Sequence, residues 1–181
     1  MGQRRSIEGS RILVTGASQG IGHELAMAAA GHGARVLAVA RSENLLRELS
    51  DQVQARGLRL KVLVDDVTLP QDRQRMAEEA VKRLGGLDIL VNNAGIGATG
   101  HFAEVSPERL RKIMEVNFFG MTEMIRVFLP ILKQGRKPAI VNISSIAGKR
   151  GIPARSEYSA SKFAVQGFSE ALRAELAKDF D

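Results

Sequence analysis

The stretch VTGASQGIG, residues 14–22, decides the fold of this chain. Three glycines, Gly16, Gly20 and Gly22, follow the apolar run Ile12-Leu13-Val14 and precede a segment with helical periodicity. A sharp turn out of a buried strand favours glycine, because glycine adopts positive φ values at little cost. Missing side chains also let an anion approach the N–H groups at the start of a helix, where the helix dipole favours negative charge. The stretch therefore predicts a strand–turn–helix unit that binds a phosphate group.

The spacing of these glycines, Thr-Gly-x-x-x-Gly-x-Gly, differs from the more common Gly-x-Gly-x-x-Gly fingerprint. A tight turn between a strand and a helix can need glycine for geometry alone, so a purely structural explanation of the turn is the alternative. Its position at the first strand–helix unit of an alternating chain favours phosphate binding.

Short apolar runs alternate with helical patterns along the whole chain. Nearly continuous apolar strands are typical of parallel strands buried on both faces, so the pattern predicts an α/β fold with helices on both faces of a parallel sheet. Ligands of such open sheets bind beyond the carboxyl ends of the strands. The expected strands are 11–15, 35–40, 60–64, 88–92 and 139–144, and the expected helices are 21–30, 42–56, 71–84, 107–133 and 158–178.

Two prolines mark the ends of the longest expected helix, 107–133. Pro107 suits the first turn of a helix, with Ser106 as its N-cap. Pro130 is expected to bend or end the same helix, because proline lacks the backbone N–H that the helix interior needs.

The composition indicates one globular domain, residues 1–181. The chain is 44% hydrophobic and 25% charged, as is usual for soluble proteins, and no apolar run approaches the roughly 18 residues of a membrane span. It has no cysteine, which excludes disulfides, thiol nucleophiles and zinc–thiolate sites and fits a reducing compartment. We expect no metal site and a cytoplasmic protein.

The formal net charge of +6 comes from basic residues that are scattered as pairs among acidic ones. Nucleic-acid-binding proteins usually concentrate their charge in a patch or stripe, so we expect no nucleic-acid partner. The start of the chain, MGQRRS, loosely matches the N-myristoylation pattern, but a short polar lead-in to the first strand is the expected interpretation.

A tyrosine and a lysine lie four residues apart in the last expected helix, at Tyr158 and Lys162. This spacing places both on one helix face, where the lysine ammonium favours the phenolate form and makes the phenol a better acid. An ordinary amphipathic turn is the alternative, but Tyr158 is the only tyrosine in the chain. Ser145 and the segment 92–95 each follow an expected strand, so all three segments should converge on one crevice.

Together these residues resemble the short-chain dehydrogenase/reductase family, in the branch with the Thr-Gly-x-x-x-Gly-x-Gly loop. The resemblance covers essentially the whole chain and implies a Rossmann-type doubly wound sheet with strand order 3-2-1-4-5. It also implies a homo-dimer or homo-tetramer, paired through the last helix and the long helix before it. The matching positions are residues 15–22, Asp66-Val67, residues 92–95, Asn117, Ser144-Ser145, and Tyr158 with Lys162.

The resemblance implies four catalytic residues. Tyr158 would be the general acid that protonates the carbonyl oxygen as hydride arrives, and Lys162 would assist it and hold the nicotinamide ribose. Ser145 would hydrogen-bond the substrate oxygen. Asn117 would hold a water molecule in a proton relay to the lysine, although a helical asparagine alone suggests only a mildly unfavourable helix residue.

The cofactor contacts are implied in the same way, along the glycine loop and at the ends of the third and fourth strands. For Asp66, a cap on the following helix is an alternative that is compatible with binding. The implied residues are Gly16, Ala17, Ser18, Gln19, Gly20, Ile21, Gly22, Asp66, Val67, Asn93, Ala94, Gly95, Tyr158 and Lys162.

The end of the second strand predicts the cofactor. An NAD-preferring site usually places a carboxylate there to hold the ribose 2′-hydroxyl, whereas this strand ends Val39-Ala40-Arg41. Because arginine binds phosphate through several donors, we expect Arg41 to hold the 2′-phosphate of NADP(H). Many relatives carry a second basic residue where Gln19 stands, and a solvated Arg41 is the alternative.

The sequence departs from the family pattern at its end. Relatives usually continue with a sixth strand, a segment touching the nicotinamide amide, a substrate lid and a seventh strand, so we expect these C-terminal strands to be missing, through truncation or as a natural short form. The remaining substrate-side segments are 96–102 and 147–157. The predicted function is an NADP(H)-dependent oxidoreductase that interconverts a small-molecule ketone and a secondary alcohol. The alternative is a catalytically silent dinucleotide-binding sensor or scaffold.

Overall fold

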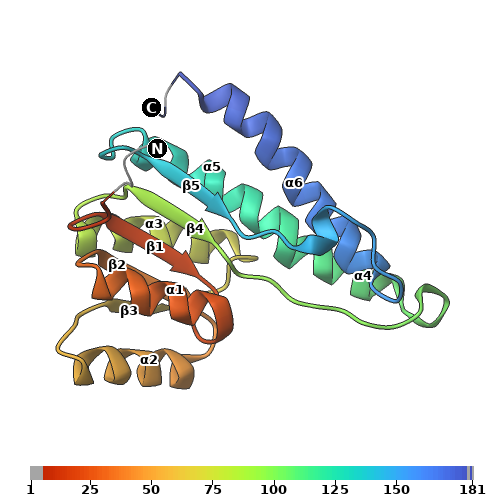
Figure 1. Cartoon of the computed structure of the whole chain (residues 1–181), viewed down its shortest axis with the longest axis horizontal. Helices are drawn as coiled ribbons and strands as arrows, with labels where there is room; N and C mark the ends of the chain where they lie inside the picture. The colour runs from red at the N-terminus through yellow and green to blue at the C-terminus, as the bar shows by residue number, and fades with distance from the viewer. Residues whose placement is uncertain (1–5, 179, 181) are drawn as a thin grey trace.

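A parallel five-stranded sheet forms the centre of the computed structural model, which describes residues 6–178 and 180. The strands stand in the order β3-β2-β1-β4-β5, and every neighbouring pair is parallel (Figure 1). This order confirms the predicted Rossmann-type sheet. The strands are β1 (Arg11–Thr15), β2 (Arg35–Ala40), β3 (Lys61–Val64), β4 (Ile89–Asn92) and β5 (Ala139–Asn142).

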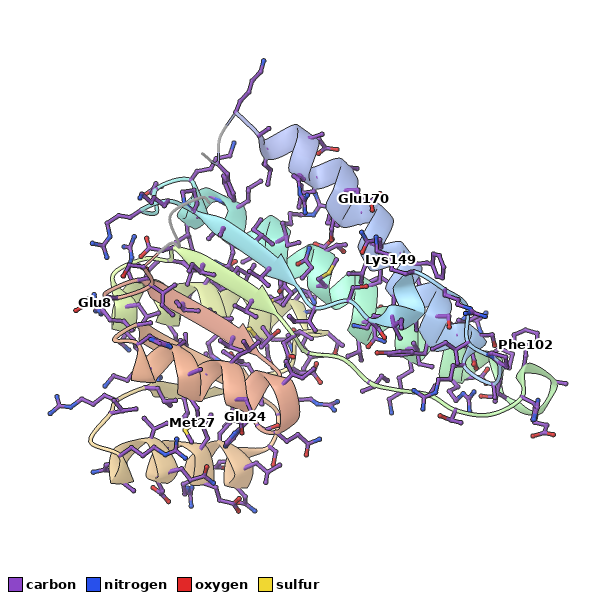
Figure 2. The ribbon with its side chains drawn as sticks, in the orientation of Figure 1. Glu8, Glu24, Met27, Phe102, Lys149 and Glu170 are labelled. Carbon is purple, nitrogen blue, oxygen red and sulfur yellow. The ribbon has the colours of Figure 1, made fainter. Side chains whose placement is uncertain are left out.

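Helices cover both faces of the sheet, as predicted (Figure 1). Side chains of β1 alternate between the two faces: Ile12 and Val14 pack with α1 and α2, whereas Leu13 packs with α3 and α5. Met27 of α1 lies buried between α1 and α2 (Figure 2). The helices are α1 (Gly20–Gly31), α2 (Glu43–Ala55), α3 (Pro70–Leu84), α4 (Pro107–Met114), α5 (Gly120–Leu132) and α6 (Ser156–Leu176), with short 3-10 turns η1 (Phe102–Glu104) and η3 (Ile146–Gly148).

The expected single helix over 107–133 is wrong in one respect. A π-helical turn, η2 (Glu115–Phe119), separates α4 from α5. Asn117 lies in this turn, where the backbone hydrogen bonds span five residues instead of four. The predicted cap is confirmed, because Ser106 Oγ accepts a hydrogen bond from the Arg109 N–H at 3.4 Å. Pro130 lies inside α5, and the helix ends soon after it at Leu132.

Of the MGQRRS start, residues 1–5 lie outside the described part of the chain. Within the described part, no helix combines the length and the apolar character needed to cross a membrane. Open parallel sheets bind ligands at the carboxyl ends of their strands, where the strand–helix turns gather, so we expect the functional site at that edge.

A buried carboxylate joins three segments at the opposite, amino-terminal edge of the sheet. Asp88 is fully buried, and its oxygens accept hydrogen bonds from Arg11 Nη2 at 2.6 Å and from the backbone N–H groups of Arg11 and Arg136 at 2.9 and 2.6 Å. Burial alone would raise the pKa of Asp88, but the hydrogen bonds from Arg11 and Arg136 outweigh it and lower the pKa to about 2. The ionised carboxylate thus stabilises the folded state.

We expect Asp88→Asn to lower the free energy of unfolding by about 2–4 kcal/mol at neutral pH, because Arg11 loses its charged partner. The native carboxyl has a lower pKa than the unfolded one, so its contribution is complete above pH ~4 and is lost as the pH falls toward about 2. Urea unfolding at neutral pH measures the first effect, and a series from about pH 5 to about pH 2 measures the second, with the exposed Asp51→Asn as control. An acid dependence equal in wild type and Asp88→Asn would contradict this account.

Candidate functional site

Hydrogen bonds at the carboxyl edge of the sheet join the turn after β1 to the turn after β4. Thr15 Oγ1 accepts from the N–H groups of Asn93 and Ala94, both at 3.0 Å. In return, Asn93 Nδ2 donates to the carbonyl oxygens of Thr15 and Gly16 at 3.0 and 3.1 Å. The glycine turn is therefore held in place by the strand that lies next to it.

The three glycines of the turn are each required by this geometry. Gly16 and Gly20 have φ values of +65° and +58°, which other residues rarely adopt. A Cβ on Gly16 would lie 2.8 Å from the Ala94 Cα, and a Cβ on Gly22 would collide with Asn93 Nδ2 and the Gly16 carbonyl. Gly22, in the first turn of α1, therefore packs directly against Asn93 and the Gly16 backbone.

A cleft of about 480 Å³ opens above this turn. Its volume falls within the usual range for small-molecule sites, and it is lined by turns that follow β1, β2, β3 and β4. Most of the predicted cofactor residues line it: Gly16, Ser18, Gln19, Gly20, Ile21, Arg41, Asp66, Val67, Asn93, Ala94 and Gly95. Two lie beneath its surface: Ala17 and Gly22 are buried, and the Ala17 N–H donates to the Val39 carbonyl at 3.1 Å.

Seven further residues line this cleft, and of these only Ile96 was expected near the site, as the start of the substrate-side segment 96–102. Their signal was positional, because most of them are direct neighbours of predicted residues at the carboxyl ends of the strands. Val116 belongs to the π turn and carried no such signal. The seven are Val39, Ala40, Ser42, Leu45, Asp65, Ile96 and Val116.

The two carboxylate oxygens of Asp66, at the rim of the cleft, contact different partners. Its Oδ1 accepts from the Thr68 N–H at 2.9 Å and from the Thr68 hydroxyl at 2.8 Å, which fixes the turn before α3. Its Oδ2 lies 3.6 Å from Arg41 Nη1. The Arg41 side chain is 62% exposed, so this ion pair is screened by water and can exchange partners.

The neighbouring Asp65 is buried, unlike Asp66. Its Oδ1 accepts from Arg75 Nε at 2.8 Å, and Oδ2 has no hydrogen-bond partner among the described residues. Burial raises the pKa of the Asp65 carboxyl, although the hydrogen bond and charge of Arg75 oppose it. The ion pair with Arg75 thus holds Asp65 at the end of β3, beneath the rim formed by Asp66.

Lys162 and Tyr158 share one face of α6, as predicted. Lys162 is only 5% exposed, and its Nζ donates to the Ile143 carbonyl at 2.8 Å, just beyond β5. Its Nζ lies 5.9 Å from the centre of the half-buried Tyr158 ring. Burial lowers the pKa of the Lys162 ammonium.

The segment after β5 packs directly on α6. Ser144 Oγ donates to the Lys162 carbonyl at 3.3 Å, and no space remains at Gly148 for a Cβ between the Lys162 carbonyl and Ser144 Oγ. Lys149 also lies beside Glu170 of α6, with Nζ and Oε1 3.8 Å apart (Figure 2). Ser145 Oγ accepts from the Ala147 N–H at 3.1 Å, which caps η3.

Asn117 links the π turn to the other parts of the site. Its Oδ1 accepts from the Ile96 N–H at 2.8 Å, and its Nδ2 donates to the Ile96 carbonyl and to Ser161 Oγ, both at 3.0 Å. Gly95 marks the junction: a Cβ there would lie 3.2 Å from Asn117 Oδ1 and 3.7 Å from Lys162 Nζ. Because Gly95 also lines the cleft, the cleft and Lys162 meet at this residue.

In the described residues, no three His, Asp or Glu side chains gather in a way that could hold a metal ion. The described residues place a glycine-lined cleft next to the buried Lys162, which shares a helix face with Tyr158. This combination resembles a nucleotide-binding site with acid–base groups at one end.

The chain belongs to the short chain dehydrogenase family, whose pattern it matches over residues 10–179. It is 37% identical to an uncharacterized oxidoreductase, YxnA, of Bacillus subtilis, and 38% identical to the 3-ketodihydrosphingosine reductase of Bacteroides thetaiotaomicron. These matches cover 93% and 91% of this chain but 48% and 58% of those proteins, so the chain spans about half the length of these relatives.

A solved structure of similar fold is a short-chain dehydrogenase/reductase from Burkholderia phymatum in complex with NAD. It is 31% identical to this chain and superposes with a TM-score of 0.92. The match covers 97% of this chain and 63% of that one. The similarity confirms both the family and the fold that the sequence predicted.

We expect Gly22→Ala to lower the free energy of unfolding by about 1–3 kcal/mol, because the new methyl group meets a backbone carbonyl that cannot move freely. Gly167→Ala is the matched control: Gly167 is an exposed residue of α6 with open space around it, and alanine there should stabilise by about 0.5–1 kcal/mol. Thermal unfolding of both variants gives the comparison. Equal effects at the two positions would show that the turn is not tightly packed.

Proposed function

We propose that this protein is an NADP(H)-dependent oxidoreductase that interconverts a ketone and a secondary alcohol. The observation that carries the proposal is Gly95, which lines the cleft and lies beside Lys162 and Asn117. One extended dinucleotide in the cleft would therefore end next to the acid–base groups. The similar structure that was solved with NAD supports a nicotinamide dinucleotide as the ligand.

The residues present fit such a ligand. Side chains are missing where a pyrophosphate must approach the backbone, and Cβ atoms at Gly16 and Gly22 would block the turn. The first N–H groups of α1, which begins at Gly20, have no partners within the helix and can bind phosphate oxygens. Asp66 and Val67 would contact the adenine, and Asn93 would lie near its ribose. When bound, the cofactor would supply or accept the hydride.

Tyr158 is the group that would move the proton, giving it to the carbonyl oxygen during reduction and taking it from the alcohol during oxidation. The Lys162 ammonium lies 5.9 Å from the centre of the Tyr158 ring, and its positive charge would stabilise the phenolate. Ser145 Oγ already accepts a hydrogen bond from Ala147, which leaves its hydroxyl proton to donate to the substrate oxygen. Asn117 would complete the set by keeping the Ile96 backbone in place for a water relay to Lys162.

Arg41 is the basis for the choice of NADP(H) over NAD(H). β2 ends at Ala40 with no carboxylate at its end to hold a ribose 2′-hydroxyl, and Arg41 lies at the rim of the cleft. Its exposed pair with Asp66 contributes about 0–1 kcal/mol, so a 2′-phosphate could replace that partner at little cost.

We further propose a cytoplasmic homo-dimer or homo-tetramer. The absence of cysteine from the chain agrees with a reducing compartment. Phe119 and Phe163, from η2 and α6, are about half exposed and would suit contacts between subunits.

We expect Tyr158→Phe to lower kcat by about 10²- to 10⁴-fold, because the phenol alone supplies the transferred proton. NADPH affinity should change less than about twofold, since the ring is retained. NADPH oxidation with a panel of ketones and NADPH titration of the same preparations give the two quantities. Turnover that survives in Tyr158→Phe would rule out its catalytic role. Tight NADPH binding by a wild-type protein without turnover would favour a sensor or scaffold instead.

We expect Arg41→Ala to weaken NADPH binding by about 10- to 100-fold, which corresponds to the loss of charge-assisted hydrogen bonds to the phosphate. NADH binding should stay within about twofold. Arg47→Ala, at an exposed ion pair of α2, is the control for the loss of one positive charge. Equal losses for NADPH and NADH would contradict the phosphate role of Arg41.

A further inference from the structure

The segment that follows β4 leaves the sheet, and after α4 the chain returns to the sheet through α5. Figure 1 shows this segment running past η1 to the region where α4 and the beginning of α6 lie together. Two charged residues meet there, Arg109 in the first half of α4 and Glu157 in the first turn of α6. Neither has a role in the reaction proposed above.

Arg109 and Glu157 form an ion pair with several hydrogen bonds, in which the glutamate side chain is buried and the arginine side chain is partly exposed. The Glu157 side chain is 1% exposed. Arg109 Nη2 donates to Oε1 and Oε2 of Glu157 at 2.9 and 3.0 Å, and Arg109 Nε donates to Oε1 at 3.1 Å. Such paired donors fix the relative orientation of the guanidinium and the carboxylate, and hence of α4 and α6.

The same guanidinium also holds the segment before α4. Arg109 Nη1 donates to the Thr99 carbonyl at 3.2 Å. At the next residue, the Gly100 N–H donates to the Ala154 carbonyl at 2.9 Å, which joins this segment to the one that leads into α6. Arg109 therefore contacts both the segment before α4 and the first turn of α6.

Tyr158 lies between two such anchors on α6. Glu157, immediately before it, is bound by Arg109, and Ser161, one turn later, is bound by Asn117 Nδ2 at 3.0 Å. Ser159, in the same turn, also accepts a hydrogen bond from the Ile152 N–H at 3.3 Å, which holds the backbone of the turn. The pair with Arg109 adds the bidentate side-chain contact at the residue next to Tyr158, and so contributes to how the phenol is oriented.

We propose that Arg109 is a positioning residue: through Glu157 it fixes the first turn of α6 and the 96–106 segment, and so sets the orientation of the Tyr158 ring. The catalytic consequence rests on the proposed function, whereas the orientation of the ring does not. A misplaced proton donor lowers kcat, whereas the glycine turn that would bind most of the cofactor is not altered, so cofactor affinity should change little.

The test is Arg109→Lys, which keeps the positive charge but loses the paired hydrogen bonds. Tyr158 is the only tyrosine and the chain has no tryptophan, so the near-ultraviolet circular dichroism of tyrosine reports this ring alone. We expect the tyrosine band to change, kcat to fall by about 10- to 100-fold, and NADPH affinity to stay within about twofold. Arg126→Lys, at an exposed ion pair of α5, is the matched control and should leave all three unchanged.

Arg109→Lys with the wild-type tyrosine band and wild-type kcat would overturn the proposal. If the tyrosine band changes but wild type itself has no turnover, the positioning role stands and the proposed enzyme function fails. If Arg109→Lys does not fold, the double variant Arg109→Met/Glu157→Gln decides, because it leaves no unpaired buried charge. A wild-type tyrosine band in that variant would also overturn the proposal, and an altered band would support it.

Discussion

The hydroxyl of Thr15 accepts hydrogen bonds from two successive backbone N–H groups, those of Asn93 and Ala94, and so holds the ends of β1 and β4 together. The cleft depends on this contact. The hydrogen bonds of Thr15 hold the glycine turn so close to the turn after β4 that no side chain fits at Gly16 or Gly22. The same closeness leaves a backbone surface that a phosphate group can approach, so a packing constraint also provides the binding surface.

The second half of the site is built around a lysine that is almost completely buried. Burying an ammonium is costly unless it is hydrogen-bonded, and the Ile143 carbonyl beyond β5 supplies one bond at 2.8 Å. This contact fixes α6 against the end of the sheet, and Ser144 adds a second one through the Lys162 carbonyl. Gly95 joins this half to the cleft, because it is small enough to lie between Lys162 and Asn117.

Much of the fold could be predicted from the sequence, because buried parallel strands are continuous apolar runs and their turns carry glycine. Three expected strand ranges, 60–64, 88–92 and 139–144, are slightly longer than the observed strands. At these ends the hydrogen-bonded pairing between neighbouring strands stops before the strand-like sequence pattern does. The common helix face of Tyr158 and Lys162 follows from spacing alone. The hydrogen bond from Lys162 to the Ile143 carbonyl, just beyond β5, does not follow from the spacing, because it depends on how α6 packs.

The features that the sequence did not predict all depend on tertiary packing. The π turn at Asn117 has no periodicity signal, since one widened turn hardly alters a helical pattern. Arg109 and Glu157 lie 48 positions apart and look like ordinary charged helix residues until α4 and α6 are brought together. Asp65 differs from Asp66 only in its burial, which no local pattern separates. The family resemblance indicated Asn117, where physical reasoning from the residues alone did not.

The central claim is that one dinucleotide extends from the glycine-lined cleft to Tyr158. The most direct measurement is the fluorescence of this single tyrosine, whose emission overlaps the absorption of reduced nicotinamide, during a titration with NADPH. The account predicts saturable quenching by NADPH and none by 2′-phospho-ADP-ribose, which fills the cleft but lacks the nicotinamide. Saturating binding of NADPH with unchanged Tyr158 emission would contradict it, because the reactive end of the cofactor would then lie away from the proposed acid.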